Sequence, residues 1–415
     1  MNKFFYTLLF FLTITANNLN AQDGSYSLYS YYRFGDPMDP ANVENSAMGH
    51  LVFYSDTVHY NHFMPSTVAG LKYVNYTFSL TSNTYRLSSV NNSSRQTSFL
   101  MPYLNLGIPV KGIGGFGVGF RPYSSSGFLG KQDISDDEHI IKKGDGGLNE
   151  FFLTAGLKPY KGIHIGAGYH YYFGDKEYQV VHYRQNIFTI TYQNDNAFYR
   201  GNGFDFSFDF KQQLAGLIWK GGLYYRLKQN IVSENKSTLK LIDNSYGKPH
   251  IINQVTMRHD TTSQFIPAKW SAGFGFGKKT KWFAGLEYEN ADWNGYTNDF
   301  FTTPYVSYGK QYDWRLGGYW IPDHRIHVKY WKRINYRLGF YSGQTGLILK
   351  NTPIKHFGIT FGMVLPIRNY LSNAAVDFEY EHRGTKDNGL ILENIFKIKI
   401  NVSLNARWFT KRKIN

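Results

Sequence analysis

The stretch FKIKINVSLNARWF, residues 396–409, decides the fold, because its side chains alternate between apolar and polar without a break. Successive side chains of a β-strand point to opposite sides, so such a strand has one apolar and one polar face. The apolar face carries Phe396, Ile398, Ile400, Val402, Leu404, Ala406 and Trp408. It would meet the core of a soluble sandwich or the lipid around an outer-membrane barrel, whose lumen the polar face would line.

The composition of the 415-residue chain is compatible with a barrel. Hydrophobic residues make up 42% and the mean hydropathy is −0.40, and no internal run approaches the roughly 20 apolar residues of a membrane helix. A barrel escapes a hydropathy search because half of each strand is polar. Aromatic residues reach 18% and are typical of strands and bilayer interfaces.

The chain has a formal net charge of +15 and contains no cysteine. We interpret the basic charge as a surface facing anionic lipid headgroups or lipopolysaccharide, and we expect no nucleic-acid partner. The absence of cysteine excludes disulfides and thiolate-bound metals.

The first residues have the pattern of a targeting segment. Asn2 and Lys3 precede the apolar run FFYTLLFFLTI at 4–14, which is too short to span a bilayer, and Ala21 closes a plausible cleavage site. We therefore expect residues 1–21 to be a signal peptide that is removed, and the mature chain to lie in the outer membrane of a bacterial cell.

Alternating segments recur from Tyr76 onward and predict an all-β transmembrane antiparallel barrel over residues 68–409, followed by a basic tail at 410–415. We expect strands near 76–91, 97–110, 114–126, 150–160, 162–175, 203–213, 217–229, 266–277, 281–291, 309–321, 329–342, 355–366, 373–383 and 394–409. These are about fourteen strands. The segment 230–265 holds further alternating pieces, so sixteen is the alternative count.

Connections between these segments alternate in length, which favours the barrel over the sandwich. Long polar gaps are expected at 127–149, 176–202, 230–265 and 292–308. Short gaps are expected at 111–113, 160–162, 214–216 and 278–280. Bacterial barrels have long external loops and short periplasmic turns.

Residues 22–67 lack sustained alternation yet are rich in large apolar side chains, which predicts an irregular plug, or hatch, inside the lumen. An irregular backbone needs partners for its polar groups, and a lumen supplies them. Candidate contacts for a ligand on its path past the hatch are Phe34, Met38, Met48, Phe53, Tyr54, Phe63 and Met64.

The polar faces of the last two strands predict a ladder of charge in the lumen. Acids on the strand at 373–383 would stand beside bases on the final strand, and such cross-strand pairs stabilise a sheet by about 0.2–1 kcal/mol each. The ladder residues are Asp377, Glu379, Glu381, Lys397, Lys399 and Arg407.

Few residues suggest chemistry. His59 and His62 have a spacing compatible with a metal, but no carboxylate pattern completes a site. His139, His170 and His182 are expected near the outer rim, where barrel enzymes place their histidines, but no nucleophile accompanies them. We therefore predict no catalytic residue, cofactor or metal, and no enzyme activity.

The chain resembles the FadL-type (OmpP1) outer-membrane transport family in the version common in the Bacteroidota. The stretches that carry the resemblance are Met48-Gly49, LNLGIPV (104–110) with GFGVGFRPYS (115–124), KWFAGLEYENADW (281–293), RINYRLGFY (333–341), and EHRG (381–384) with ARWFTKRK (406–413). The resemblance implies a fourteen-stranded barrel with an N-terminal hatch. It also implies uptake of hydrophobic molecules such as fatty acids or aromatic hydrocarbons.

Three functions are compatible with this sequence. The first is passive uptake of a hydrophobic small molecule, gated by the hatch. The second is a non-transporting accessory or structural barrel of a secretion or barrel-assembly complex, with partners docked on the external loops. The third is a general porin. In each case we expect outer-membrane lipids and lipopolysaccharide as neighbours, and barrel-assembly machinery that engages Trp408 and Phe409 at the C-terminus.

Overall fold

A computed structural model describes residues 24–185, 187–245, 249–298, 300–301, 303–325, 327–367 and 372–407. The predicted signal peptide, the proposed assembly signal Trp408 and Phe409, and the basic tail lie outside these residues. Within the described part of the chain, no helix is long and apolar enough to cross a membrane.

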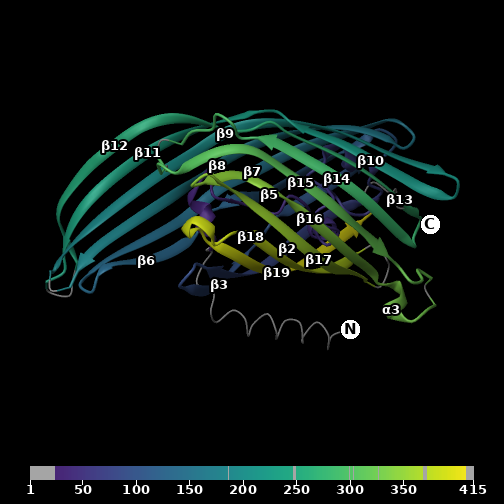
Figure 1. Ribbon diagram of the computed structural model, residues 1–415. Coiled ribbons are helices and arrows are strands. Elements are labelled where there is room, and N and C mark those ends of the chain that lie inside the picture. Colours follow the sequence, from purple (N-terminus) through teal and green to yellow (C-terminus); the bar gives the residue numbers. More distant parts are fainter. Residues whose placement is uncertain are drawn as a thin grey trace, which may run out of the picture.

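The chain forms a closed antiparallel β-barrel (Figure 1). The first wall strands are β2 (Val74–Ser88), β3 (Ser93–Leu100), β4 (Leu104–Val110), β5 (Gly114–Ser125), β6 (Phe128–Ser135), β7 (Glu138–Tyr160), β8 (Ile163–Arg184) and β9 (Thr189–Leu214). They are followed by β10 (Leu217–Arg226), β11 (Gln229–Asp243), β12 (His250–Ile266), β13 (Lys269–Lys278) and β14 (Trp282–Asp292). The last are β15 (Val306–Trp320), β16 (Asn335–Leu349), β17 (Thr352–Pro366), β18 (Asn373–Gly384) and β19 (Leu392–Ala406). β19 pairs with β2 and closes the wall.

Four of the wall strands are each split into two pieces. β3 and β4 pair with successive parts of β2, and β5 and β6 pair with successive parts of β7. β10 and β11 share β9 in the same way, and β12 and β13 together face β11 and β10. The wall therefore has fourteen strands, as predicted. The alternative of sixteen is wrong, because the pieces within 230–265 lengthen two strands instead of adding two.

The long gaps expected at 127–149, 176–202 and 230–265 are mostly strand, so the expectation of loops there is wrong. They form long hairpins that extend past one end of the barrel (Figure 1, left). β12 explains the error, since its outer part is exposed on both faces. A hairpin solvated on both sides needs no continuous apolar face, so its sequence carries only short alternating pieces. The gap before β15 is irregular, as expected.

The register of the final strand is the predicted one. Ile400 is 49% exposed on the outer face, whereas the neighbouring Lys399 is 1% exposed and points inward. β18 and β19 pair in register across the turn that holds the short helix η4 (Asp387–Gly389). The apolar residues therefore face outward, where a bilayer would lie, and the polar residues face the lumen.

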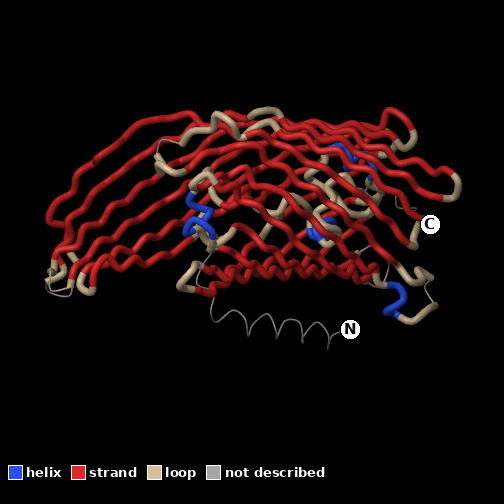
Figure 2. Tube along the Cα trace, viewed as in Figure 1, coloured by secondary structure: helices blue, strands red, loops and turns tan. Residues whose placement is uncertain are grey.

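The N-terminal segment lies inside the barrel (Figure 2). It contains η2 (Leu28–Tyr31), β1 (Asp36–Pro37), α2 (Val43–Ser46) and η3 (Pro65–Gly70), joined by irregular chain. η3 crosses the predicted boundary at residue 67, and β2 begins only at Val74. The hatch therefore runs through residue 73. At the end of the barrel with short turns, α3 (Tyr330–Arg333) lies between β15 and β16.

Candidate functional site

The hatch contacts all fourteen strands of the wall. α2 packs against β17, β18 and β19, and η3 packs against β4, β5, β7, β8 and β9. Phe53 lies against glycines of β10, β13 and β14, and the backbone of Met48 and Gly49 lies against glycines of β15 and β16. The backbone N–H of Tyr60 donates to Asn75 of β2. The lumen is therefore plugged along its whole circumference.

Wall glycines allow this close approach. A Cβ atom added at Gly339 would lie 1.9 Å from the backbone nitrogen of Gly49, and one added at Gly317 would lie 2.0 Å from the carbonyl oxygen of Met48. Gly49 itself has φ of 65°, a left-handed conformation that favours glycine. Backbone of the hatch thus contacts backbone of the wall with no side chain between them.

Charged side chains of β18 and β19 form a buried ladder. Glu379 stands opposite Lys397 and Asp377 opposite Lys399. The ammonium nitrogen of Lys397 lies 3.0 Å from Glu379 and 3.0 Å from Glu381, and that of Lys399 lies 2.6 Å from Glu379. Five of the six residues predicted for the ladder thus meet in the lumen.

Arg407 does not join the ladder, so this part of the prediction is wrong. It follows the end of β19, is exposed, and its guanidinium carbon lies 5.6 Å from the ring centre of Tyr73. The alternation of the sequence continues to this residue, but the strand does not.

The hatch inserts its own groups into the ladder. A carboxylate oxygen of Asp39 lies 2.8 Å from the Lys397 nitrogen, and its other oxygen lies 2.7 Å from that of Lys399. Burial alone would raise the pKa of Asp39, but the two ammonium groups outweigh it and hold the pKa below its ordinary value. His50 of the hatch lies 3.1 Å from Glu379. Strand alternation in the sequence predicted the partners on the wall. Asp39 lies outside any alternating segment and could not be predicted in this way.

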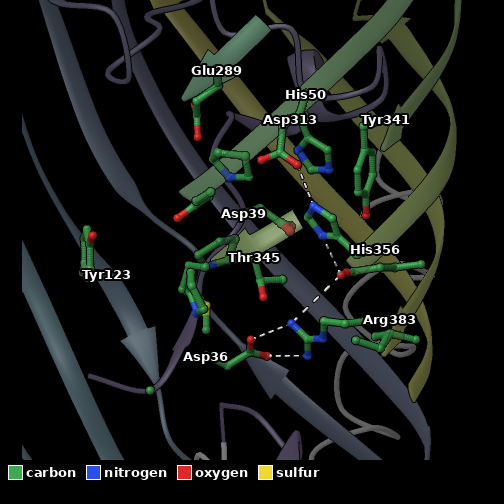
Figure 3. A pocket seen from close by; sticks show the side chains of 18 of the residues that line it. Asp36, Asp39, His50, Tyr123, Glu289, Asp313, Tyr341, Thr345, His356 and Arg383 are labelled. Carbon is green, nitrogen blue, oxygen red and sulfur yellow. Dashed lines mark hydrogen bonds and ion pairs between the residues drawn. The ribbon is translucent and has the colours of Figure 1, made fainter. Parts of the chain in front are cut away.

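A second ionic contact between the hatch and the wall lies nearby (Figure 3). Arg383 binds Asp36 through two nitrogens at 2.7 and 3.0 Å, and it also lies 2.7 Å from Glu393 of the wall. His356 lies 2.6 Å from Asp313 and 3.5 Å from Glu381, and the contact with Glu381 links this ionic group to the ladder. Bidentate pairs of this kind are directional as well as strong. They therefore fix where Asp36 sits.

The opposite wall carries a third ionic group. Arg121 lies 2.6 Å from Glu150, and His170 lies 2.8 Å from Asp205. His170 is buried inside the lumen, so the prediction that placed it near the outer rim is wrong. His139 and His182 lie on the outer hairpin, beside Asp133 and Glu138 respectively.

The seven hatch residues proposed as ligand contacts divide into two groups. Five are buried in packing: Phe34 between Tyr199 and Tyr296, and Met48, Phe53, Tyr54 and Met64 around Phe283. Met38 and Phe63 line the central cavity. Most of these side chains therefore hold the hatch in place.

The central cavity measures about 200 Å³, and its lining mixes aromatic and aliphatic side chains with ionisable ones, among them Asp39, Arg121, Glu289 and Arg383. An apolar molecule placed there would take charges out of water without providing hydrogen bonds in return, which is costly. The charged part of the lining therefore suits water or a polar group better than a hydrocarbon.

The wall itself has a break beside this cavity. β3 pairs with β2 alone, and the pairing of β4 with β5 ends at Leu104 and Phe120. Beyond that point the hatch takes the empty place, since β1 pairs with Ser124 and Ser125 of β5. Residues Leu100 and Pro102 at the break line the cavity. The break is thus closed from inside by the hatch.

The two histidines weighed as metal ligands do not converge. His59 lies 2.6 Å from Asp56, and these carboxylate contacts outweigh burial and raise its pKa to about 9. His62 stacks on Phe152, and burial beside Arg121 holds its pKa well below the ordinary value. Asp39, His50 and Glu379 do place ligand atoms within 4.8 Å of one another. The Lys399 ammonium lies at 2.6–2.7 Å from both carboxylates and supplies the cation there.

A family model described as BamG matches residues 1–415. The chain belongs to the BamG family. No curated protein matches it. The name of this family differs from that of the FadL-type family, which the sequence resembles.

Solved structures show that the BamG-family chain shares the FadL-type fold. A FadL homologue of Pseudomonas aeruginosa is 10% identical and matches with a TM-score of 0.61 over 89% of this chain and 100% of the other. The toluene transporter TbuX of Ralstonia pickettii is 12% identical, with a TM-score of 0.59 over 90% and 99% of the two chains. The toluene transporter TodX of Pseudomonas putida is 12% identical, with 0.58 over 88% and 98%.

Proposed function

We propose that this chain is an accessory or structural barrel of an outer-membrane assembly or secretion complex, and that its lumen is not a route for small molecules. The observation that carries the proposal is the hatch, which touches every wall strand and contributes side chains to two buried ionic groups. Opening a path would separate Asp39 from two lysines and Asp36 from Arg383. Breaking buried pairs costs about 3–5 kcal/mol each.

The outer hairpins support the same proposal. On the outer hairpin, β12 carries exposed apolar side chains, namely Ile251, Ile252, Val255 and Met257. Clusters of exposed apolar residues mark interaction surfaces. We infer that the β11–β12 hairpin docks a protein partner. The match to the BamG family model is compatible with this proposal.

Native purification from the original membrane tests this proposal. We expect a stoichiometric protein partner, and no lipid-like density beside Met38 or Phe63. Substituting Ile252 and Met257 by serine should release the partner while the barrel stays folded. A barrel that purifies alone, with apolar density beside the hatch, would overturn the proposal.

Uptake of a hydrophobic molecule is the second candidate, and the break between β3 and β5 favours it. Such a break offers a sideways exit from the central cavity to the bilayer, with Met38 and Phe63 as contacts. Deleting residues 24–60 should then change permeability to hydrophobic probes. Unaltered permeability would count against uptake. The porin alternative requires steady single-channel conductance in planar bilayers.

A further inference from the structure

A second internal cavity lies at the end of the barrel with short turns, where barrels face the periplasm. This inner-mouth cavity measures about 640 Å³ and lies between hatch residues 54–59 and the ends of the surrounding strands. Its size falls within the range of about 300–1,000 Å³ that is usual for ligand pockets. It is separate from the central cavity, which Asp36 and Asp39 of the hatch line.

The charge of this cavity is one-sided. Lys211, Lys220 and Arg337 reach into it, and Lys278 and Lys279 stand at its rim. Among the described residues, none of these five cations has a carboxylate oxygen within 4 Å. The one acid in the lining, Asp56, is already bound by His59 at 2.6 Å. The ladder deeper in the lumen is different, since each of its lysines has acidic partners.

Two of the cations face each other directly. Lys211 of β9 stands opposite Lys220 of β10, and both side chains point into the lumen. Like charges in directly opposed positions destabilise a sheet. Lys220 is 7% exposed, and its ammonium lies 3.8 Å from the ring centre of Tyr54 and donates to the carbonyl oxygen of Ser55. These contacts orient the charge without neutralising it.

Arg337 is the most deeply buried of the five, with 2% of its surface exposed. One guanidinium nitrogen donates to the backbone carbonyl of Glu44, whereas its Nε has no partner. A buried cation with an unused donor is costly to keep. The cavity therefore lacks a counter-charge, and an anion from outside would supply it.

We propose that the inner-mouth cavity binds an acidic peptide segment of a periplasmic partner. Carboxylates at intervals along a chain match cations that run from the rim to the buried Arg337. The lining also offers Trp282, Phe283 and Tyr319, against which apolar side chains of a peptide can pack. The inference rests on the proposed role as an accessory barrel, and it names a second docking surface opposite the outer hairpins.

Fluorescence anisotropy with the purified full-length barrel in detergent tests the proposal. The probe is a labelled peptide of about ten residues with alternating Glu and Leu, and its matched control carries Gln in place of Glu. We expect the Glu peptide alone to bind, and salt to weaken its binding. Because a hydrogen bond to a charged group contributes about 1.5–3 kcal/mol, K220Q or K211Q should weaken binding roughly tenfold or more.

The control variants separate charge from folding. K220R keeps the charge and should keep binding. The double variant K142Q/K143Q removes two cations from the outer hairpin and should leave binding unchanged. Equal binding of both peptides, or no effect of K211Q and K220Q, would overturn the proposal. So would binding of inorganic phosphate or phosphatidylglycerol vesicles with no binding of the peptide. Native purification tests the partner of the outer hairpins separately. Failure of the peptide to bind would therefore overturn this inference alone, and absence of a co-purified partner would overturn the proposed function.

Discussion

Replacing Asp39 by asparagine tests whether charge or packing holds the hatch. The substitution keeps the size of the side chain and one acceptor oxygen, but it removes the charge that faces two ammonium groups at 2.7 and 2.8 Å. Lys397 and Lys399 retain their carboxylate partners on β18, so no charge is left unpaired. The loss therefore concerns the contact of hatch with wall.

The magnitude follows from these contacts. Each hydrogen bond to a charged group contributes about 1.5–3 kcal/mol, and asparagine retains part of one of the two. We expect the hatch near residue 39 to lose roughly 2–3 kcal/mol of stability against local opening, which is below the cost of an uncompensated buried charge. A tenfold change in an equilibrium corresponds to about 1.4 kcal/mol, so opening becomes roughly 30- to 150-fold more frequent.

Hydrogen exchange read by mass spectrometry measures local opening directly. Amides of residues 36–50 should exchange faster in D39N by that factor, while those of the wall strands do not change. D133N is the matched control, because Asp133 is an exposed acid between Lys131 and His139 on the outer hairpin. An increase in the exchange rate of less than about threefold would refute the reasoning. Packing of the backbone against the wall would then be what holds the hatch in place.

Three further predictions test the hatch and the register. The pKa of His59 is raised to about 9, so its ion pairs stabilise the folded hatch fully below the ordinary pKa of about 6.5 and are lost as pH rises through 9. Protease cleavage of the hatch should therefore increase between pH 7 and 10. The variant H59N should abolish this pH dependence. G339A should push the hatch off β16 and cost about 1–3 kcal/mol, whereas G130A, where nothing lies within 4 Å, should be neutral in denaturant titrations. I400K on the lipid face should destabilise the barrel by about 2–4 kcal/mol in refolding into liposomes, and I252K on the outer hairpin should not.

Much of the wall could be predicted from the sequence because a membrane strand must be apolar on one side and polar on the other. That requirement acts residue by residue, so the alternation at 396–406 revealed both the strand and its orientation. The same reasoning failed for the outer hairpins, where β12 is solvated on both faces and needs no alternation. It also failed at Arg407, because hydrogen bonding, not alternation, ends a strand.

The sequence by itself predicted the barrel, about fourteen strands, the inward side of the last two strands and five of the charged residues that line the lumen there. The tertiary structure alone decided which groups of the hatch meet them. Asp36 lies in the two-residue strand β1, Asp39 and His50 lie in irregular chain, and the partners of all three are more than 300 residues away. The tertiary structure also left Lys211, Lys220 and Arg337 at the inner mouth with no carboxylate oxygen within 4 Å among the described residues. Local periodicity specifies a strand. Whether a buried charge finds a partner of opposite charge depends on which distant residues the closed barrel brings together.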